Sequence, residues 1–145
     1  MDEALRAYGD AVGLGPLATD ANGTCTLEFD GRLEVTLASD PDRARVVLWL
    51  VLGALPESGR AEAMEALLRA NLFWRETGGA TLSLMPQGGD VVMAAEWPLP
   101  GLDGQTLRVL VEGLVERSDA LLPLLRGQPV AASPGALPPH GMILA

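Results

Sequence analysis

Two short stretches near the start of the chain alternate strictly between apolar and polar residues. Every second residue is apolar over 24–29 and again over 33–37. Alternation of this kind is typical of strands that bury one face. Asp30 and Gly31 lie between the two stretches and indicate a tight turn. The pattern therefore predicts a β-hairpin.

The predicted register of this hairpin follows from its apolar positions. A two-residue loop of Asp30 and Gly31 would place the apolar residues of the two strands on opposite faces, because a one-residue slip turns every side chain over. A three-residue loop over 30–32, with Gly31 at a positive φ, keeps one common apolar face. This loop pairs Phe29 with Leu33, Leu27 with Val35 and Cys25 with Leu37.

Three segments show the three-to-four-residue spacing of amphipathic helices. The first covers 2–13, with Asp2 as its expected N-cap, and the second covers 60–77 after a break. The third begins after Asp103, which is predicted to cap it, and Pro123 is expected to bend or shorten its last turns.

The predicted helix over 60–77 has more apolar surface than one small sheet can cover. One stripe consists of Met64, Leu68 and Leu72, and the neighbouring stripe of Ala63, Leu67, Ala70 and Trp74. On the polar edge, Glu65 and Arg69 can pair at i,i+4. We therefore expect this helix to contact a second subunit.

The remaining apolar segments complete the predicted sheet. The stretch 44–52 is apolar on both faces, which favours a strand covered on both sides and leaves a buried helix as the alternative. A second hairpin follows across the loop 86–89, in which Ala80, Leu82 and Leu84 face Ala95, Met93 and Val91. The order of elements predicts an α+β domain, α-β-β-β-α-β-β-α, with an antiparallel sheet packed against helices.

Length and composition place these elements in a single domain. The chain has 145 residues and 48% hydrophobic residues, which suffice for one buried core. We expect the domain to span 1–126. The segment 127–145, which contains four prolines among small residues, is expected to form a flexible tail.

Charge and hydropathy exclude several classes of partner. A net charge of −9 repels phosphate backbones, so nucleic acid is not expected as a partner. The longest apolar run, 46–55, is about half of the roughly 20 residues that a membrane-spanning helix requires, so no membrane insertion is expected. The N-terminus has no basic region followed by an apolar stretch, and Cys25 is the only cysteine. Both features favour the cytoplasm.

No catalytic or cofactor-binding constellation is visible. Phosphate-binding glycine loops and nucleophile elbows are absent from the sequence. The only histidine, His140, lies in the expected tail, and Cys25 is predicted to be a buried, inert thiol. The acidic pairs Asp40 with Asp42 and Glu62 with Glu65 fit turn or surface positions. We predict a binding protein without cofactor or metal; a small carboxylate-using enzyme is the remote alternative.

The order of elements and several short stretches resemble the class I type III secretion chaperones of the Tir chaperone (CesT-like) family. The resemblance covers residues 2 to 126. The matching stretches are Val12-Gly13-Leu14-Gly15, 25–30, 52–56, 67–73, 79–84, Pro98-Leu99-Pro100 and Leu102-Asp103. Two features depart from the family pattern: the segment after Gly127, and Leu121-Leu122-Pro123 where many members carry an aromatic residue.

The resemblance implies a small acidic homodimer in the bacterial cytoplasm. Such a protein binds the N-terminal segment of a secreted effector and keeps it soluble and competent for secretion, without catalysis. The implied effector-binding residues are Leu5, Tyr8, Val12, Leu27, Phe29, Leu33 and Val35. The implied dimer contacts are Leu67, Ala70, Asn71, Phe73, Trp74, Trp49 and Leu82. A regulatory protein that sequesters a transcriptional regulator or an anti-activator on the same fold is the alternative.

Overall fold

A computed structural model describes residues 1–128 and contains the elements predicted, in the predicted order. They are α1 (Asp2–Val12), β1 (Thr24–Phe29), β2 (Leu33–Asp40), β3 (Arg45–Ala54), α2 (Arg60–Ala70), η1 (Leu72–Trp74), β4 (Thr81–Leu84), β5 (Asp90–Pro98), α3 (Gly104–Leu121) and η2 (Leu122–Arg126). The α+β prediction is confirmed. The expected tail, with His140, lies almost wholly outside the described residues.

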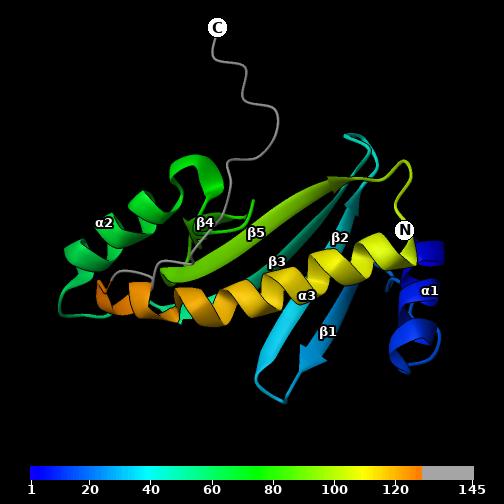
Figure 1. The fold of residues 1–145 in the computed structure, drawn as a ribbon, viewed down its shortest axis with the longest axis horizontal. Helices are drawn as coiled ribbons and strands as arrows, with labels where there is room; N and C mark the ends of the chain where they lie inside the picture. Colours follow the sequence, from blue (N-terminus) through cyan, green and yellow to red (C-terminus); the bar gives the residue numbers. More distant parts are fainter. Residues whose placement is uncertain (129–145) are drawn as a thin grey trace, which may run out of the picture.

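The five strands form one antiparallel sheet in the order β1-β2-β3-β5-β4. The long helix α3 runs across one face of this sheet and contacts β2, β3 and β5 (Figure 1). Helix α1 packs against α3 near one end, and α2 lies with η2 near the other. Strands β1 and β4 are the two edges of the sheet.

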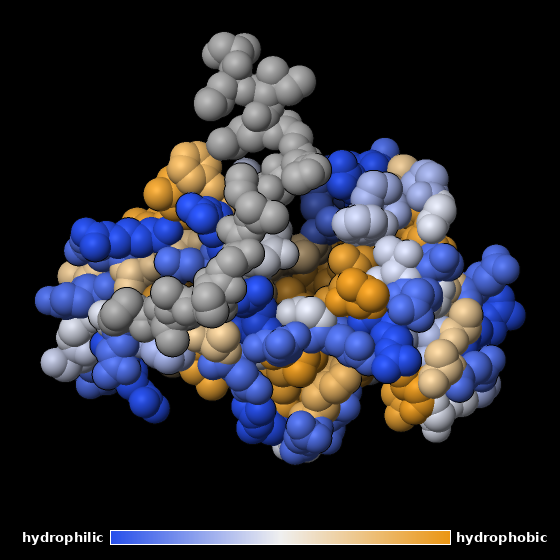
Figure 2. Space-filling model, viewed as in Figure 1, coloured by the Kyte–Doolittle hydropathy of each residue, from blue (hydrophilic) through white to orange (hydrophobic). Residues whose placement is uncertain are grey.

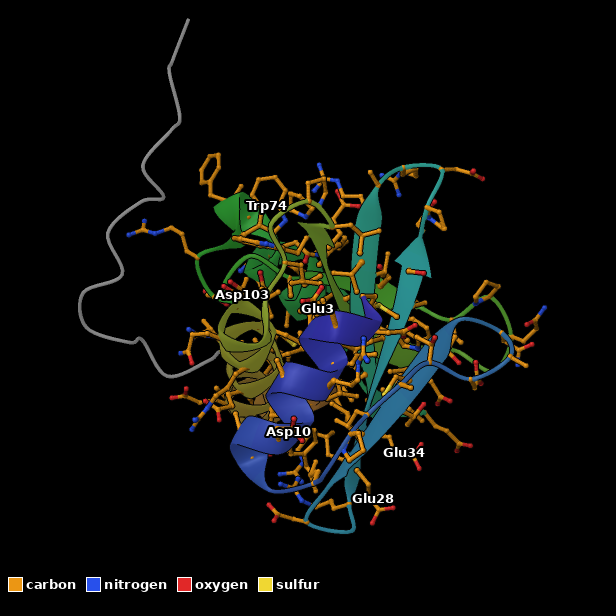
Figure 3. The ribbon with its side chains drawn as sticks, turned by 90° about the vertical axis from the view of Figure 1, so that its right-hand side faces the viewer. Glu3, Asp10, Glu28, Glu34, Trp74 and Asp103 are labelled. Atoms are coloured by element: carbon orange, nitrogen blue, oxygen red, sulfur yellow. The ribbon has the colours of Figure 1, made fainter. Side chains whose placement is uncertain are left out.

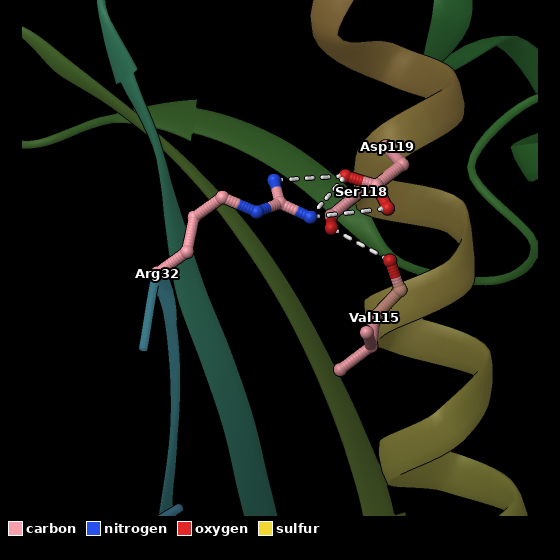
Figure 4. A network of polar contacts seen from close by, with 4 residues as sticks. All are labelled: Arg32, Val115, Ser118 and Asp119. Atoms are coloured by element: carbon pink, nitrogen blue, oxygen red, sulfur yellow. Dashed lines mark hydrogen bonds and ion pairs between the residues drawn. The ribbon is translucent and has the colours of Figure 1, made fainter. Parts of the chain in front are cut away.

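The first hairpin has the predicted register. Phe29 pairs with Leu33, and the three-residue loop includes Asp30 and Gly31, whose φ angles are 54° and 61°. The loop is tied to α3, because the Arg32 guanidinium donates hydrogen bonds to the Asp119 carboxylate at 3.1 Å (Figure 4). An exposed ion pair therefore links the hairpin loop to the long helix at the surface.

Strand β3 is covered on one face only, so the prediction of a strand covered on both sides is wrong. Val46, Leu48 and Leu50 are buried under the helices. On the opposite face Trp49 is half-buried and Val51 is exposed. No helix of residues 1–128 lies on that second face, and its apolar residues are left to other contacts.

Helix α2 is shorter than the 60–77 predicted from its periodicity. It ends at Ala70, and the following Phe73 and Trp74 have left-handed φ angles of 55° and 53°. Such angles are costly for residues with a Cβ and cannot continue an α-helix. The apolar spacing past Ala70 therefore reflects a compact turn. Its exposed side chains project from the end of the helix.

The helix caps confirm one prediction and correct another. The Asp103 carboxylate accepts a hydrogen bond from the Thr106 backbone N–H at 2.7 Å, as predicted for the N-cap of α3. Asp2 is the first residue of α1, and its carboxylate instead accepts hydrogen bonds from the backbone and hydroxyl of Thr19. At the far end Pro123 lies in the first turn of η2, where α3 stops.

Candidate partner-binding surfaces

Five of the seven predicted effector-binding side chains lie inside the monomer. Their packing against α3 and the sheet fills the main core. Val12 and Phe29 are half-buried at its margin. The five buried residues are Leu5, Tyr8, Leu27, Leu33 and Val35.

Burial also changes the pKa values of two side chains in this cluster. Desolvation raises the pKa of the Tyr8 hydroxyl, with a smaller contribution from the charge of Glu112. Desolvation likewise raises the pKa of the Cys25 thiol, which favours the unreactive protonated form. In this conformation these side chains stabilise the fold, and only Val12 and Phe29 of the predicted set offer partial surface to a partner.

The open face of the sheet, opposite α3, carries an apolar strip at its centre. Neighbouring strands bring the apolar side chains together: Trp49 is paired with Ala94, and Val51 with Val92. Polar residues of β1 and β2 extend the same face toward the edge. The strip consists of Val47, Trp49, Val51, Val92 and Ala94.

Two carboxylates lie next to this strip. Glu28 and Glu34 are direct cross-strand partners on β1 and β2, and both are exposed. Figure 3 shows them on the side of the sheet away from α1. Within residues 1–128 neither makes an ion pair, whereas Glu96 on the same face is paired with Arg43 at 3.3 Å. Like charges directly opposite each other destabilise a sheet.

The two glutamates, Trp49 and Val51 line a shallow groove of about 260 Å³, together with Arg32, whose guanidinium is paired with Asp119. Its chemistry suits a cationic side chain with an apolar stem. The stem would lie on the indole and valine, and the head group between the carboxylates. Sequence periodicity identified the strand but could not show that this face lacks a covering helix.

A second apolar surface lies at the other end of the molecule, where α2, η1 and β4 meet. Leu68 and Leu72 are 72% and 63% exposed, and Phe73 and Trp74 are 51% and 52% exposed. Figure 2 shows apolar atoms at this end. The α2–η1–β4 surface consists of Met64, Leu68, Leu72, Phe73, Trp74, Leu84 and Met85.

The predicted dimer contacts divide between this surface and the interior. Phe73 and Trp74 belong to the α2–η1–β4 surface, and half-buried Asn71 binds the backbone of β4. Trp49 lies on the open face. Leu67, Ala70 and Leu82 are buried within the monomer. The stripe of α2 that faces outward is therefore the one formed by Met64, Leu68 and Leu72. None of these three residues is among the predicted dimer contacts.

One carboxylate of each acidic pair, Asp40 and Glu65, has a local structural role. The Asp40 carboxylate accepts a hydrogen bond from the Arg43 backbone N–H at 3.1 Å, within the turn before β3. Glu65 forms the predicted ion pair with Arg69 on α2. Across residues 1–128 no group of three potential metal ligands is found, and no helix is long and apolar enough to cross a membrane.

The family model of the Tir chaperone protein (CesT) family matches residues 3–122. The chain belongs to this family. A Tir chaperone from Citrobacter freundii is 26% identical over 124 residues, which cover 86% of this chain and 78% of the relative.

Solved structures show the same fold. The Yersinia pestis type III secretion chaperone SycH, in complex with a fragment of YscM2, has a TM-score of 0.66 and 21% identity over 83% of this chain and 98% of its own. A chain of the HopA1–SchA chaperone–effector complex has a TM-score of 0.66 and 24% identity, over 80% of this chain and 88% of its own.

Proposed function

We propose that this protein is a type III secretion chaperone that binds the N-terminal segment of a secreted effector and keeps it soluble until export. The carrying observation is the match of the Tir chaperone family model to 3–122, on a fold that leaves two apolar surfaces uncovered. Binding of this kind requires no cofactor and no catalytic group. It takes place in the bacterial cytoplasm, where the effector is synthesised.

One of the two surfaces is assigned to a second copy of the chain. The α2–η1–β4 surface ends in two aromatic side chains held at left-handed backbone angles, Phe73 and Trp74. Left-handed backbone at residues with a Cβ costs free energy, and contacts of the two exposed aromatic side chains with a partner would offset that cost. An isologous interface, in which each copy buries the same residues, supplies such contacts twice.

The open face of the sheet and the adjoining β1 edge are assigned to the effector. An unfolded effector segment exposes apolar side chains, and burial contributes about 25 cal/mol per Å² against the entropy of ordering the segment. The strip around Trp49 offers such burial, and Glu28 with Glu34 favours segments that carry Lys or Arg. Strand β1 can also accept an added strand at its edge.

The test is capture of the natural partner followed by reconstitution. Tagged protein is purified from its native host, and the retained protein is identified by mass spectrometry. The purified complex is then treated with protease to map the protected partner segment. We expect the protease to leave intact an N-terminal segment of a secreted protein. Light scattering should give the mass of a complex that contains two copies of this chain.

Two variants locate the contact. Val51→Glu on the open face should weaken the reconstituted complex at least tenfold, because it places a charge in apolar surroundings. Leu14→Glu, also at an exposed apolar residue but next to α1 on the helical side of the sheet, is the matched control and should bind like the wild type. Capture of a transcriptional regulator, or a protected segment that is a folded domain, would establish the regulatory alternative.

A further inference from the structure

A third recess lies on the helical face, between α3 and the loop that leads into β4. Its volume is about 270 Å³, and it is open on one side. In Figure 2 apolar residues lie recessed between the positions of α3 and β5. The floor is formed by Ala80, Met93, Ala95, Leu110 and Leu114. We call this recess the α3–loop groove.

One wall of the α3–loop groove carries a buried hydroxyl without a partner. Thr77 is 1% exposed, and its Oγ1 makes no hydrogen bond within the described residues. A buried hydroxyl without a partner is costly, and native proteins leave few of them. Thr77 lines the groove. A bound group that accepts or donates a hydrogen bond there would remove the cost.

The rim of the groove carries a cation that is equally unpaired. The half-buried Arg117 side chain lies so close over Gly78 that a Cβ there would be 3.2 Å from its Nε. Within residues 1–128 the Arg117 guanidinium makes neither a hydrogen bond nor an ion pair. Its neighbour Glu116 also lines the groove and is exposed. The Thr77 hydroxyl and the Arg117 guanidinium are both hydrogen-bond donors without a partner in residues 1–128. An acceptor oxygen of a ligand could bind both.

The α3 side of the groove, one helical turn before Arg117, is shaped by a missing side chain. Gly113 interrupts the apolar surface of α3, and a Cβ built there would meet nothing within 4 Å. The groove therefore remains open at a position where a large side chain would partly cover it. Glycine in a helix interior lowers stability relative to alanine. No close packing at Gly113 requires a glycine.

We infer that the α3–loop groove is an anchor site for one apolar side chain of a bound peptide, whose adjacent main-chain carbonyl accepts hydrogen bonds from Thr77 and Arg117. The inference rests on the proposed function for the source of the peptide, which is the effector segment. It adds a third contact, on the helical side of the sheet, to the open face and the β1 edge.

The dimensions favour a single side chain. Pockets that hold whole small-molecule ligands measure about 300–1,000 Å³ and enclose most of the ligand. The α3–loop groove is smaller and open on one side, as a site for one side chain of a passing chain would be. An apolar floor with two donors at one wall matches a leucine-like side chain and the carbonyl beside it.

The first test uses a probe that is independent of any effector. N-acetyl-leucine methylamide, which has one apolar side chain between two amides, is titrated into the full chain and followed by methyl NMR. We expect a Kd of about 1 mM, typical of such a small fragment. The methyl signals of Ala80, Met93 and Ala95 should shift, and those of Leu14 should not. N-acetyl-glycine methylamide is the control. Absence of these shifts would overturn the inference.

The second test exploits the unpaired hydroxyl, because stability and binding should move in opposite directions. Thr77→Val keeps the shape of the side chain and removes the orphaned group. It should raise the melting temperature by about 3 °C and weaken the binding of the probe about tenfold. A variant that is less stable than the wild type, or one that binds the probe equally well, would show that the hydroxyl has no ligand role.

Gly113 supplies a matched pair of variants on the α3 side of the groove. Gly113→Ala adds one methyl group in open space and should stabilise α3 while retaining the probe. Gly113→Leu should fold equally well but cover the groove and abolish binding. Retained binding in Gly113→Leu contradicts the assignment. A failure to capture any effector would leave these probe results standing, so the two proposals fail separately.

Discussion

The Asn71 side-chain amide pairs with both backbone groups of Leu82. Its Nδ2 donates to the Leu82 carbonyl oxygen at 3.0 Å, and its Oδ1 accepts from the Leu82 N–H at 2.8 Å. Strand β4 is an edge of the sheet, so these backbone groups would otherwise be open to another strand. A side chain thus occupies the place of a neighbouring strand. It also fixes the end of α2 against the sheet.

This pairing predicts the effects of two substitutions at Asn71. Asn71→Ala leaves a partly buried N–H and carbonyl without partners and should lower the free energy of unfolding by about 2 kcal/mol. Asn71→Asp can still accept from the Leu82 N–H but places a carboxylate against the carbonyl oxygen. Urea denaturation at several protein concentrations measures both. Equal stability of Asn71→Ala and the wild type would show that the pairing contributes nothing.

Neighbouring leucines on α2 should respond in opposite ways, because Leu67 is buried and Leu68 is exposed. Leu68→Glu places a charge on the α2–η1–β4 surface, so we expect a folded monomer in place of the proposed dimer. Leu67→Ala leaves a cavity in the core and should lower the free energy of unfolding by about 3 kcal/mol.

Light scattering and urea denaturation separate these two outcomes. Leu68→Glu should change the mass in solution and leave the circular dichroism spectrum intact. The α2–η1–β4 surface is not the dimer interface if Leu68→Glu forms a dimer as tight as that of the wild type.

The opposed carboxylates on the open face predict a gain in stability when one is removed. Glu34→Gln should stabilise the chain by about 0.5 kcal/mol, because Glu28 then faces a neutral partner. The same change should weaken the binding of a peptide of alternating lysine and leucine, and added salt should reduce the difference. Asp10→Asn, which removes the same charge on α1, is the control (Figure 3). Equal affinity in both variants would contradict a role for Glu34 in binding.

Some of this architecture follows from local patterns and some does not. The hairpin register was predictable, because Phe29 and Leu33 must share a face in any register that buries one side. The end of α2 was not predictable from apolar spacing, since it depends on the contact between Asn71 and a strand eleven residues away.

The candidate surfaces were less predictable than the fold. Periodicity shows which residues share a face but not what covers that face, so Leu5 and Tyr8 were assigned to a partner although they fill the core. The converse holds for Leu68, whose stripe was visible in the sequence but whose outward direction depends on the packing of its neighbour Leu67. Thr77 ends the helix predicted over 60–77 but lies in a loop, so apolar spacing could not reveal its orphaned hydroxyl.

The N-cap of α3 predicts how stability depends on acidity. The hydrogen bond from the Thr106 backbone N–H is the main cause that lowers the pKa of the Asp103 carboxyl below its ordinary value of 3.8. The unfolded chain therefore takes up this proton more readily than the folded chain. The contribution of Asp103 is fully present above about pH 4 and is lost as the pH falls through the lowered pKa.

Asp103→Asn isolates this contribution, because asparagine caps a helix about as well as aspartate but does not titrate. We expect nearly unchanged stability at pH 7 and a flatter decline below about pH 4, measured as urea midpoints from neutral to acidic pH. Asp2 and Asp20, whose pKa values are also lowered by hydrogen bonds, remain in the variant and sustain part of the decline. If the variant and the wild type lost stability in parallel down to the lowest pH, the cap would carry no part of the acid sensitivity.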